Sequence, residues 1–223
     1  ICTNIYSLEL LESLKSHAKE EKRLGMEAYM KNQFSFIGTS SELRKQVLKQ
    51  HIQDHQLPAD NQFEAIVKSL WLLKKRELNY CAQEMELRKK WFQKKESIHL
   101  IEWMIINDSW WDTVDFIAAS LAGGYFTSFP DQKEIITRQW NNSNNMWLVR
   151  SSIIFQLKYK EKVDLELLSE LLTPHLDSKE FFIQKAIGWS LRQVSKTFPE
   201  FVRVFIASHD LKPISRREAI KYI

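Results

Sequence analysis

Cysteine, glycine and proline are all scarce in this sequence. Its 223 residues include two cysteines, five glycines and five prolines. Because strand-rich folds need many tight turns, the shortage of glycine and proline favours helices. Cys2 and Cys81 do not form the spacing of a metal or redox site, which is typical of a reducing compartment, so we expect a cytoplasmic protein. No apolar run approaches the length of a membrane span, so we expect no membrane partner.

The N-terminal stretch ICTNIYSLELLESLK (1–15) lacks the apolar core of a signal peptide and is typical of an amphipathic helix. The chain does not begin with methionine, so we expect it to be a trimmed form. No composition shift or low-complexity linker divides the sequence. Its length suits one large domain or two small ones, and the even composition predicts a single domain over residues 1–223.

Positive charge is concentrated in one segment. The formal net charge is +4, whereas residues 74–95 alone contain eight Lys or Arg and three Glu. A local excess of this kind permits an anionic partner without proving one.

Nearly every segment has the periodicity of a helix. Helices are predicted at about 5–19, 41–55, 61–73, 77–91, 97–106, 110–121, 131–140, 145–158, 164–172, 179–195, 198–207 and 215–222. The connections are short and contain helix breakers, such as GGYFTSFPD at 123–131. Many helices with short connections predict an all-α fold, an α-solenoid of stacked antiparallel helix pairs of the HEAT-like or armadillo-like kind. Such a stack is expected to curve around a concave basic groove.

A repeat near 40 residues would support this architecture. Trp111, Arg150 and Trp189 are separated by 39 residues in each step. Residues one period apart occupy equivalent positions in successive units, although a coincidence of three could arise by chance. If the period is real, these three residues and Asp115 converge on one surface. Two indole faces, a carboxylate and a guanidinium would suit a cationic group on a nucleic acid.

The heptapeptide SWWDTVD (109–115) supplies two of these residues. Ser109 followed by Asp112 is a capping-box pattern. Trp110 begins an apolar stripe that continues through Val114, Ile117, Ala118 and Leu121. Trp111 and Asp115 lie on another face, where the small Ala119 and Ala122 would leave room beside them. Alternatively, Trp111 is a rim tryptophan and Asp115 a solvated surface acid.

Two further segments place charge among apolar residues. Arg150 stands in a helix that is apolar nearly all round, so its guanidinium needs a carboxylate or phosphate partner. The alternative is a structural salt bridge to an aspartate of a neighbouring repeat. In EFFIQKAIGWSLRQV (180–194), Lys185, Gly188, Trp189 and Arg192 share a face that is typical of nucleic-acid contacts. Alternatively, Trp189 packs on the stems of the two cations.

The sequence resembles the HEAT-like-repeat alkylpurine DNA glycosylases of the AlkD type, a bacterial group. The resemblance covers essentially the whole chain. It is carried by AYMKNQFSFIG (28–38), SLWLLKKRELNYCA (69–82), SWWDTVD (109–115), WLVRSSIIFQLKYK (147–160), KEFFIQKAIGWSLR (179–192) and ISRREAIKYI (214–223).

The resemblance implies hydrolysis of the N-glycosidic bond of cationic N3- and N7-alkylpurines, such as 3-methyladenine and 7-methylguanine, in duplex DNA. The family's active-site residues correspond to Trp111, Asp115, Arg150 and Trp189, with Arg150 holding a phosphate. Val149 departs from the polar residue of relatives. Contacts to DNA are expected from Tyr29, Lys74, Lys75, Arg76, Lys185, Arg192, Arg216 and Arg217. We expect a monomer that needs no metal or other cofactor; His51 and His55 have metal-ligand spacing but no further ligand nearby.

Two other functions stay open at this point. The same fold without activity could bind branched or distorted DNA, although Asp115 and Arg150 argue against that interpretation. A protein-binding HEAT scaffold would need an apolar or acidic groove, whereas the surface around Trp189 is basic.

Overall fold

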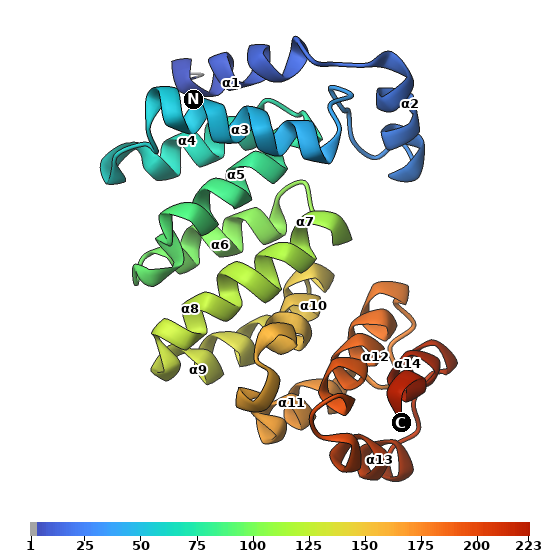
Figure 1. Cartoon of the computed structure of the whole chain (residues 1–223). Helices are drawn as coiled ribbons and strands as arrows, with labels where there is room; N and C mark the ends of the chain where they lie inside the picture. Colours follow the sequence, from blue (N-terminus) through green and yellow to red (C-terminus); the bar gives the residue numbers. More distant parts are fainter. Residues whose placement is uncertain (1–3) are drawn as a thin grey trace. The chain divides into compact units, whose positions relative to one another are not determined.

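The computed structural model describes residues 4–223, and among these residues it contains helices and loops but no strand. The all-α prediction is therefore confirmed (Figure 1). The α-helices are α1 (Ile5–Lys15), α2 (Glu20–Tyr29), α3 (Ser41–His55), α4 (Asp60–Leu72), α5 (Arg76–Lys89), α6 (Ser97–Ile106), α7 (Trp111–Phe116), α8 (Gly123–Ser128), α9 (Pro130–Asn141), α10 (Met146–Ile154), α11 (Leu165–Leu172), α12 (Phe181–Ser195), α13 (Pro199–Ser208) and α14 (Pro213–Ala219).

Shorter elements extend or join these helices. The π-helical segment η2 (Ile117–Ala122) connects α7 to α8. The remaining elements are the 3₁₀ turns η1 (Trp91–Gln93), η3 (Phe155–Lys158), η4 (Lys160–Lys162), η5 (Thr173–His175) and η6 (Ile220–Tyr222).

The chain forms two compact units, Ile1–Trp91 and Phe92–Ile223. In each unit, helices that follow one another pack together, as α4 does on α5 and α9 on α10. This is the packing expected of stacked helix pairs. The single domain over residues 1–223 and the concave groove stay predictions.

In the first unit, a buried carboxylate organises the loop that links α2 to α3. Glu77, on α5, accepts hydrogen bonds from the backbone N–H groups of Ile37, Gly38 and Thr39 at 2.9 to 3.3 Å. Gly38 has a φ of 97°, a conformation that favours glycine. The loop is thereby fixed to α5, and Phe36, one of its two aromatic residues, is buried.

In the second unit, α12 packs against α10, α13 and α14. The apolar stripe predicted for α12 is confirmed, because Ile183, Ile187, Leu191 and Val194 are all buried in one core cluster. This packing leaves a different face of α12, the face of Trp189, turned toward the functional residues described below.

Two predictions about helix limits were wrong. Helix α2 had no counterpart among the predicted helices. The glycines predicted to break the chain at 123–131 instead begin α8. They serve close packing, because a Cβ on Gly123 would lie 2.7 Å from the carbonyl oxygen of Phe155, and one on Gly124 2.7 Å from the ring of Phe92. The close approach of Phe155 and Phe92 to the helix explains these glycines, and a turn of the chain does not.

Candidate active site

Helix α7 positions Trp111 and Asp115. The helix begins at Trp111, and its N-cap is the extended residue Trp110, which makes no side-chain cap hydrogen bond. The predicted capping box was therefore wrong. The hydroxyl of Ser109 donates instead to the carbonyl oxygen of Ile105 at 2.6 Å, which draws it away from the first turn of α7.

Trp110 packs between aromatic rings. Its ring centroid lies 5.9 Å from that of Trp147 and 5.3 Å from that of Phe182, and the latter two are 5.0 Å apart. Such pairs add to the stability of apolar burial. Trp110 was predicted to belong to the core, but it is half-buried, whereas the rest of its stripe, from Val114 to Leu121, is buried. Its ring contacts connect the start of α7 to α10 and α12.

The π-helical segment η2 follows α7, the helix of Asp115. Ala119 and Ala122 were expected to leave space beside Trp111 and Asp115. Both alanines are buried. All six residues of η2 are buried, those of the predicted apolar stripe and the two alanines alike, so this segment has no open face. The prediction of an open small-residue face was wrong for this reason.

Asp115 forms a bidentate ion pair with Arg150 of α10. Nε of Arg150 donates to one carboxylate oxygen at 2.7 Å, and Nη2 donates to the other at 2.8 Å. The side chain of Arg150 is 1% exposed, whereas that of Asp115 is 20% exposed. The fork geometry fixes the carboxylate plane while part of the carboxylate stays accessible.

The remaining guanidinium nitrogen of Arg150 also has a partner inside the protein. Nη1 donates to the carbonyl oxygen of Phe182. A guanidinium that is buried and hydrogen-bonded at all three nitrogens offers a phosphate little surface. The phosphate contact expected of Arg150 is therefore corrected to an ion pair that orients Asp115, the alternative already open from the sequence.

Burial raises the pKa of Asp115 above the ordinary value of 3.8, and the ion pair with Arg150 opposes that rise. Asp112 nearby raises the pKa further by charge repulsion. Desolvation is the largest of these effects, as expected where solvent reaches only part of a carboxylate.

Trp189 of α12 lies beside the same arginine. The Cζ atom of Arg150 is 5.3 Å from the Trp189 ring centroid. Nζ of Lys185 is 5.5 Å from that centroid, and Cζ of Arg192 is 5.8 Å from it. The structure thus brings together Asp115, Arg150 and Trp189, with Trp111 one helical turn before Asp115 on α7.

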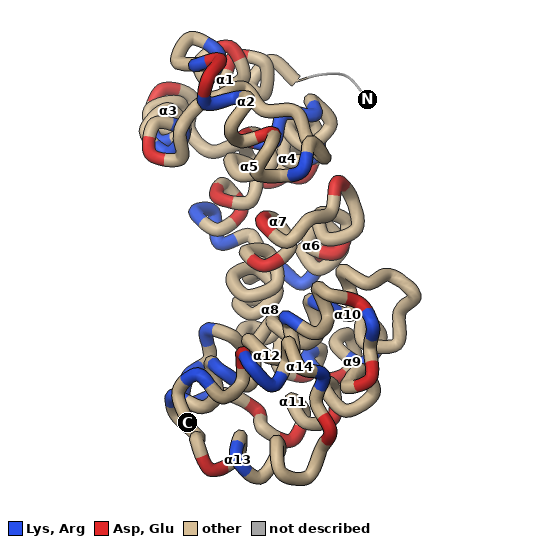
Figure 2. Tube along the Cα trace, turned by 90° about the vertical axis from the view of Figure 1, so that its right-hand side faces the viewer, with Lys and Arg blue, Asp and Glu red and all other residues tan. Residues whose placement is uncertain are grey.

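Lys185 and Arg192, predicted to contact DNA, form ion pairs within the protein. Both bind Glu218 of α14, at 2.8 and 2.7 Å respectively. Their side chains stay partly exposed, and the contact of each with a DNA phosphate stays a prediction. Arg216 and Arg217, also on α14, are exposed. Figure 2 shows the Lys and Arg positions of α12 and α14 in blue.

The other predicted DNA contacts belong to the first unit. Tyr29 is 70% exposed. It lines a cavity of about 160 Å³ together with Met26, Phe36 and Tyr80. Lys74 is exposed and Lys75 is half-buried.

The structure corrects the prediction that Arg76 contacts DNA. Its exposed fraction is 1%, and its Cζ atom lies 3.8 Å from the ring centroid of Phe34. Lys74, in the connection between α4 and α5, has a left-handed backbone with a φ of 54°. Arg76 stabilises the first unit by cation–π packing and cannot serve as a surface contact to DNA.

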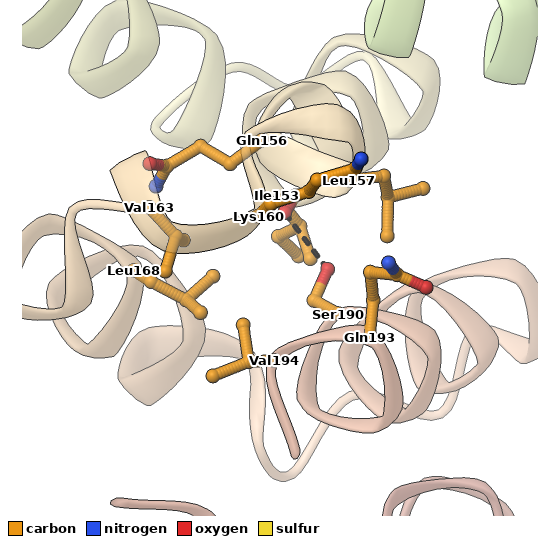
Figure 3. A pocket seen from close by; sticks show the side chains of 9 residues that line it. All are labelled: Ile153, Gln156, Leu157, Lys160, Val163, Leu168, Ser190, Gln193 and Val194. Atoms are coloured by element: carbon orange, nitrogen blue, oxygen red, sulfur yellow. Dashed lines mark hydrogen bonds between the residues drawn. The ribbon is translucent and has the colours of Figure 1, made fainter. Parts of the chain in front are cut away.

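A cavity lies between η3, α11 and α12, and none of Trp111, Asp115, Arg150 and Trp189 lines it (Figure 3). Its volume is about 10 Å³. At its wall, the hydroxyl of Ser190 donates to the carbonyl oxygen of Ile153 at 2.9 Å. A volume of this size holds about one water, so the cavity is far too small for a purine base.

Neither a metal site nor a membrane span is found in residues 4–223. No group of three or more His, Cys, Asp or Glu side chains in this range is arranged to hold a metal ion. No helix in the same range is long and apolar enough to cross a bilayer.

Two functional neighbours were missed from the sequence. The carbonyl group of Phe182 carries no signal in a sequence, because every residue has one. Glu218 did carry a signal, since it is the one acid in the basic stretch ISRREAIKYI. An acid among cations that must pack against a neighbouring helix is a candidate for the centre of an ion-pair network.

The chain is similar in sequence and structure to proteins of one family. The family model described as DNA alkylation repair enzyme matches residues 10–223. A structure described as a predicted DNA alkylation repair enzyme from Enterococcus faecalis has a TM-score of 0.86 and 29% identity, and the match covers 93% of this chain and 97% of that one.

Two Streptococcus mutans structures share the fold. One is smu.31, with a TM-score of 0.63, 14% identity, and coverage of 98% of this chain and 99% of the other. The second is AlkD2, with a TM-score of 0.64, 15% identity, and coverage of 90% and 99%. A search of the curated proteins gave no match.

Proposed function

We propose, from the premise that this chain belongs to the DNA alkylation repair enzyme family, that it is a DNA glycosylase acting in base excision repair. Its proposed substrates are cationic N3- and N7-alkylpurines in duplex DNA, such as 3-methyladenine and 7-methylguanine. The observation that carries the proposal is the partly exposed Asp115 carboxylate, held at both oxygens by buried Arg150 beside Trp189.

The chemistry of the substrate fits a site with one carboxylate. An alkylpurine with a fixed positive charge leaves as a neutral base, so the reaction needs no strong general acid. A pair of carboxylates, as in glycoside hydrolases, is therefore unnecessary. As the bond to the base lengthens, positive charge develops on the deoxyribose. Asp115 stabilises that charge and orients the attacking water.

Arg150 acts on the reaction through Asp115. A carboxylate that is held by a bidentate pair does not need to reorganise when the sugar becomes positive, and this lowers the cost of reaching the transition state. The two indoles flank the deoxyribose and gain from its growing charge, Trp111 from α7 and Trp189 from α12.

A pocket for the base is not required by this mechanism. The cavity of about 10 Å³ near Ser190 cannot hold a purine. In this mechanism, recognition depends on the charge of the lesion and its weakened bond, and on contacts between the protein and the DNA backbone. A DNA substrate also agrees with the expected cytoplasmic location, and the protein is expected to act as a monomer.

The test is release of 7-methylguanine from a duplex that contains one such base. The protein is added in excess, and abasic sites are cleaved with alkali and counted. We expect the wild type to produce strand scission, and Asp115→Asn to lower the single-turnover rate by about 10²- to 10³-fold, as loss of transition-state stabilisation does elsewhere.

Two control variants separate this effect from general damage. Asp177→Asn makes the same chemical change at a side chain that is 95% exposed in the same unit. His51→Ala alters the first unit. Both should retain the wild-type rate. Tight DNA binding by the wild type without any scission would reject the proposal in favour of a non-catalytic binder of branched or distorted DNA.

A further inference from the structure

Glu218 of α14 stands at the centre of an ion-pair network. Its side chain is 5% exposed and contacts Lys185 at 2.8 Å and Arg192 at 2.7 Å. Lys221 contacts it at 2.8 Å. One nearly buried carboxylate therefore receives three cations, two of them from α12.

Close packing of α14 on α12 places Glu218 at this point. A Cβ atom on Gly188 would lie 2.6 Å from Cβ of Glu218 and 2.8 Å from the carbonyl oxygen of Ser215. The hydroxyl of Ser215 donates to the carbonyl oxygen of Gln184 at 2.9 Å, which fixes the register of the two helices. The absence of a side chain at position 188 thus lets the carboxylate of Glu218 reach Lys185 and Arg192 on α12.

The two α12 cations held by Glu218 also flank the indole of Trp189. Lys185 precedes Trp189 by one turn and Arg192 follows it by three residues, so all three share a helix face. Their charged groups lie 5.5 and 5.8 Å from the ring centroid. The position of the carboxylate therefore decides where both cations rest against the ring.

We propose that Glu218 is a positioning residue for Trp189 in the glycosylase reaction. It holds Lys185 and Arg192 against the indole and offsets their charges beside the reacting sugar. The inference rests on the proposed function, in which Trp189 flanks the deoxyribose.

The need for such an offset follows from electrostatics. A sugar that becomes positive beside two uncompensated cations is destabilised, whereas a nearby carboxylate removes most of that repulsion. Freed from Glu218, the same cations would turn toward the DNA phosphates. Loss of the carboxylate should then strengthen DNA binding and slow the chemical step, a combination that simple unfolding does not produce.

The first experiment compares Glu218→Gln with the wild type on the duplex containing 7-methylguanine. We expect kcat to fall about 10-fold, because misplacing a group that lines the site by a fraction of an ångström has effects of this size. We expect tighter DNA binding at low salt, with a slope of log affinity against log salt that is steeper by about two. Glu200→Gln, a matched change at an exposed residue of α13, should alter neither quantity.

The second experiment does not depend on activity. The protein is labelled with 5-fluorotryptophan, and Trp189→Phe assigns the resonance of Trp189. Glu218→Gln should shift that resonance while the resonances of Trp71 and Trp91 in the first unit stay in place. Glu218→Asp keeps a carboxylate, so its Trp189 resonance and its kcat should both lie between those of Glu218→Gln and those of the wild type. It also serves as the test variant if Glu218→Gln does not fold.

The outcomes separate the two proposals. An unmoved Trp189 resonance in a folded Glu218→Gln variant would overturn the positioning role, as would a parallel loss of binding and kcat. A shifted resonance in a protein that releases no 7-methylguanine would reject the glycosylase function and leave the link from Glu218 through Lys185 and Arg192 to Trp189 established.

Discussion

At the residue scale, the two partners of the ion pair between Asp115 and Arg150 differ in burial and in role. The guanidinium is buried and donates a hydrogen bond from each of its three nitrogens, while the carboxylate is partly exposed. Taking a charge out of water is costly, and the cost is met here by two parallel hydrogen bonds and one to a carbonyl group. The charge of Arg150 thus serves to hold the carboxylate of Asp115 in one orientation.

Arg150→Lys tests whether the arginine orients Asp115 or binds DNA. Lysine keeps the positive charge but lacks the planar fork that matches both carboxylate oxygens. We expect the rate of 7-methylguanine release to fall about 10- to 100-fold, with DNA affinity within about twofold of the wild type. Single-turnover kinetics and fluorescence anisotropy measure the two quantities. Weaker binding at an unchanged rate would instead assign Arg150 to a phosphate.

The pH dependence of the reaction reports the ionisation of Asp115. Burial raises the pKa of this carboxyl above 3.8. The protonated form cannot stabilise a positive sugar, so the rate should fall as pH decreases through the raised pKa. We expect the acidic limb of the single-turnover profile to lie above the pH at which an ordinary aspartate titrates.

Arg150→Lys provides a check on that interpretation. Part of the stabilisation of the ionised carboxylate is removed with the fork, so burial is opposed less and the acidic limb should move to higher pH. Spontaneous base loss from free DNA, measured at each pH, is subtracted from both profiles. A limb that stays in place in the variant would show that another group controls it.

At the element scale, α12 and α14 depend on one residue without a side chain. Gly188→Ala introduces a Cβ at 2.6 Å from Cβ of Glu218 and 2.8 Å from a backbone oxygen, so α14 must move. Overpacking of this kind costs about 1–3 kcal/mol, more than the gain of roughly 1 kcal/mol from alanine in a helix. We expect a lower free energy of unfolding in urea.

Gly25→Ala is the matched control for this prediction. Gly25 lies within α2, and a Cβ there meets nothing within 4 Å. Alanine should therefore stabilise the protein by about 0.5–1 kcal/mol through its helix propensity. If Gly188→Ala were as stable as Gly25→Ala, α14 would have to pack less closely on α12 than the structure indicates.

Local periodicity was enough to predict most of the helices. The predicted ranges 41–55 and 97–106 coincide with α3 and α6. The buried face of α12 followed from apolar spacing alone. The segment after Asp115 could not be predicted in this way, because the π-helical turn and the helical glycines reflect contacts with distant residues, such as that of Gly123 with Phe155.

The candidate site, too, could be predicted only as far as local sequence patterns determine it. A charged residue in an apolar helix indicated that Arg150 needed a partner, and an aspartate was one of the two partners considered. Whether the partner of Arg150 is a carboxylate or a phosphate could be decided only from the structure, which places Arg150 of α10 beside Asp115 of α7. The positions of Arg76 and Glu218 also depend on long-range packing. Arg76, one of three adjacent basic residues, is buried against Phe34. Glu218, the one acid in a basic segment, binds three cations.

At the scale of the whole molecule, the predicted groove requires cations from both units to contact one duplex. Lys74 and Lys75 represent the first unit, and Arg216 and Arg217 the second. Each pair is replaced by glutamine, separately and together, and DNA affinity is measured over a range of salt concentrations. Since each phosphate contact adds about 0.9 to the slope of log affinity against log salt, each double variant should lower the slope by about one to two.

Additivity decides between one shared duplex and contact through a single unit. Contacts far apart on one DNA are independent, so the fourfold variant should lose the sum of the two slope changes. Arg203→Gln is the control, because that exposed arginine already pairs with Glu200 on its own helix and should leave the slope unchanged. If either double variant behaved like this control, only the other unit would contact the duplex, and a groove formed by the whole chain would have to be abandoned.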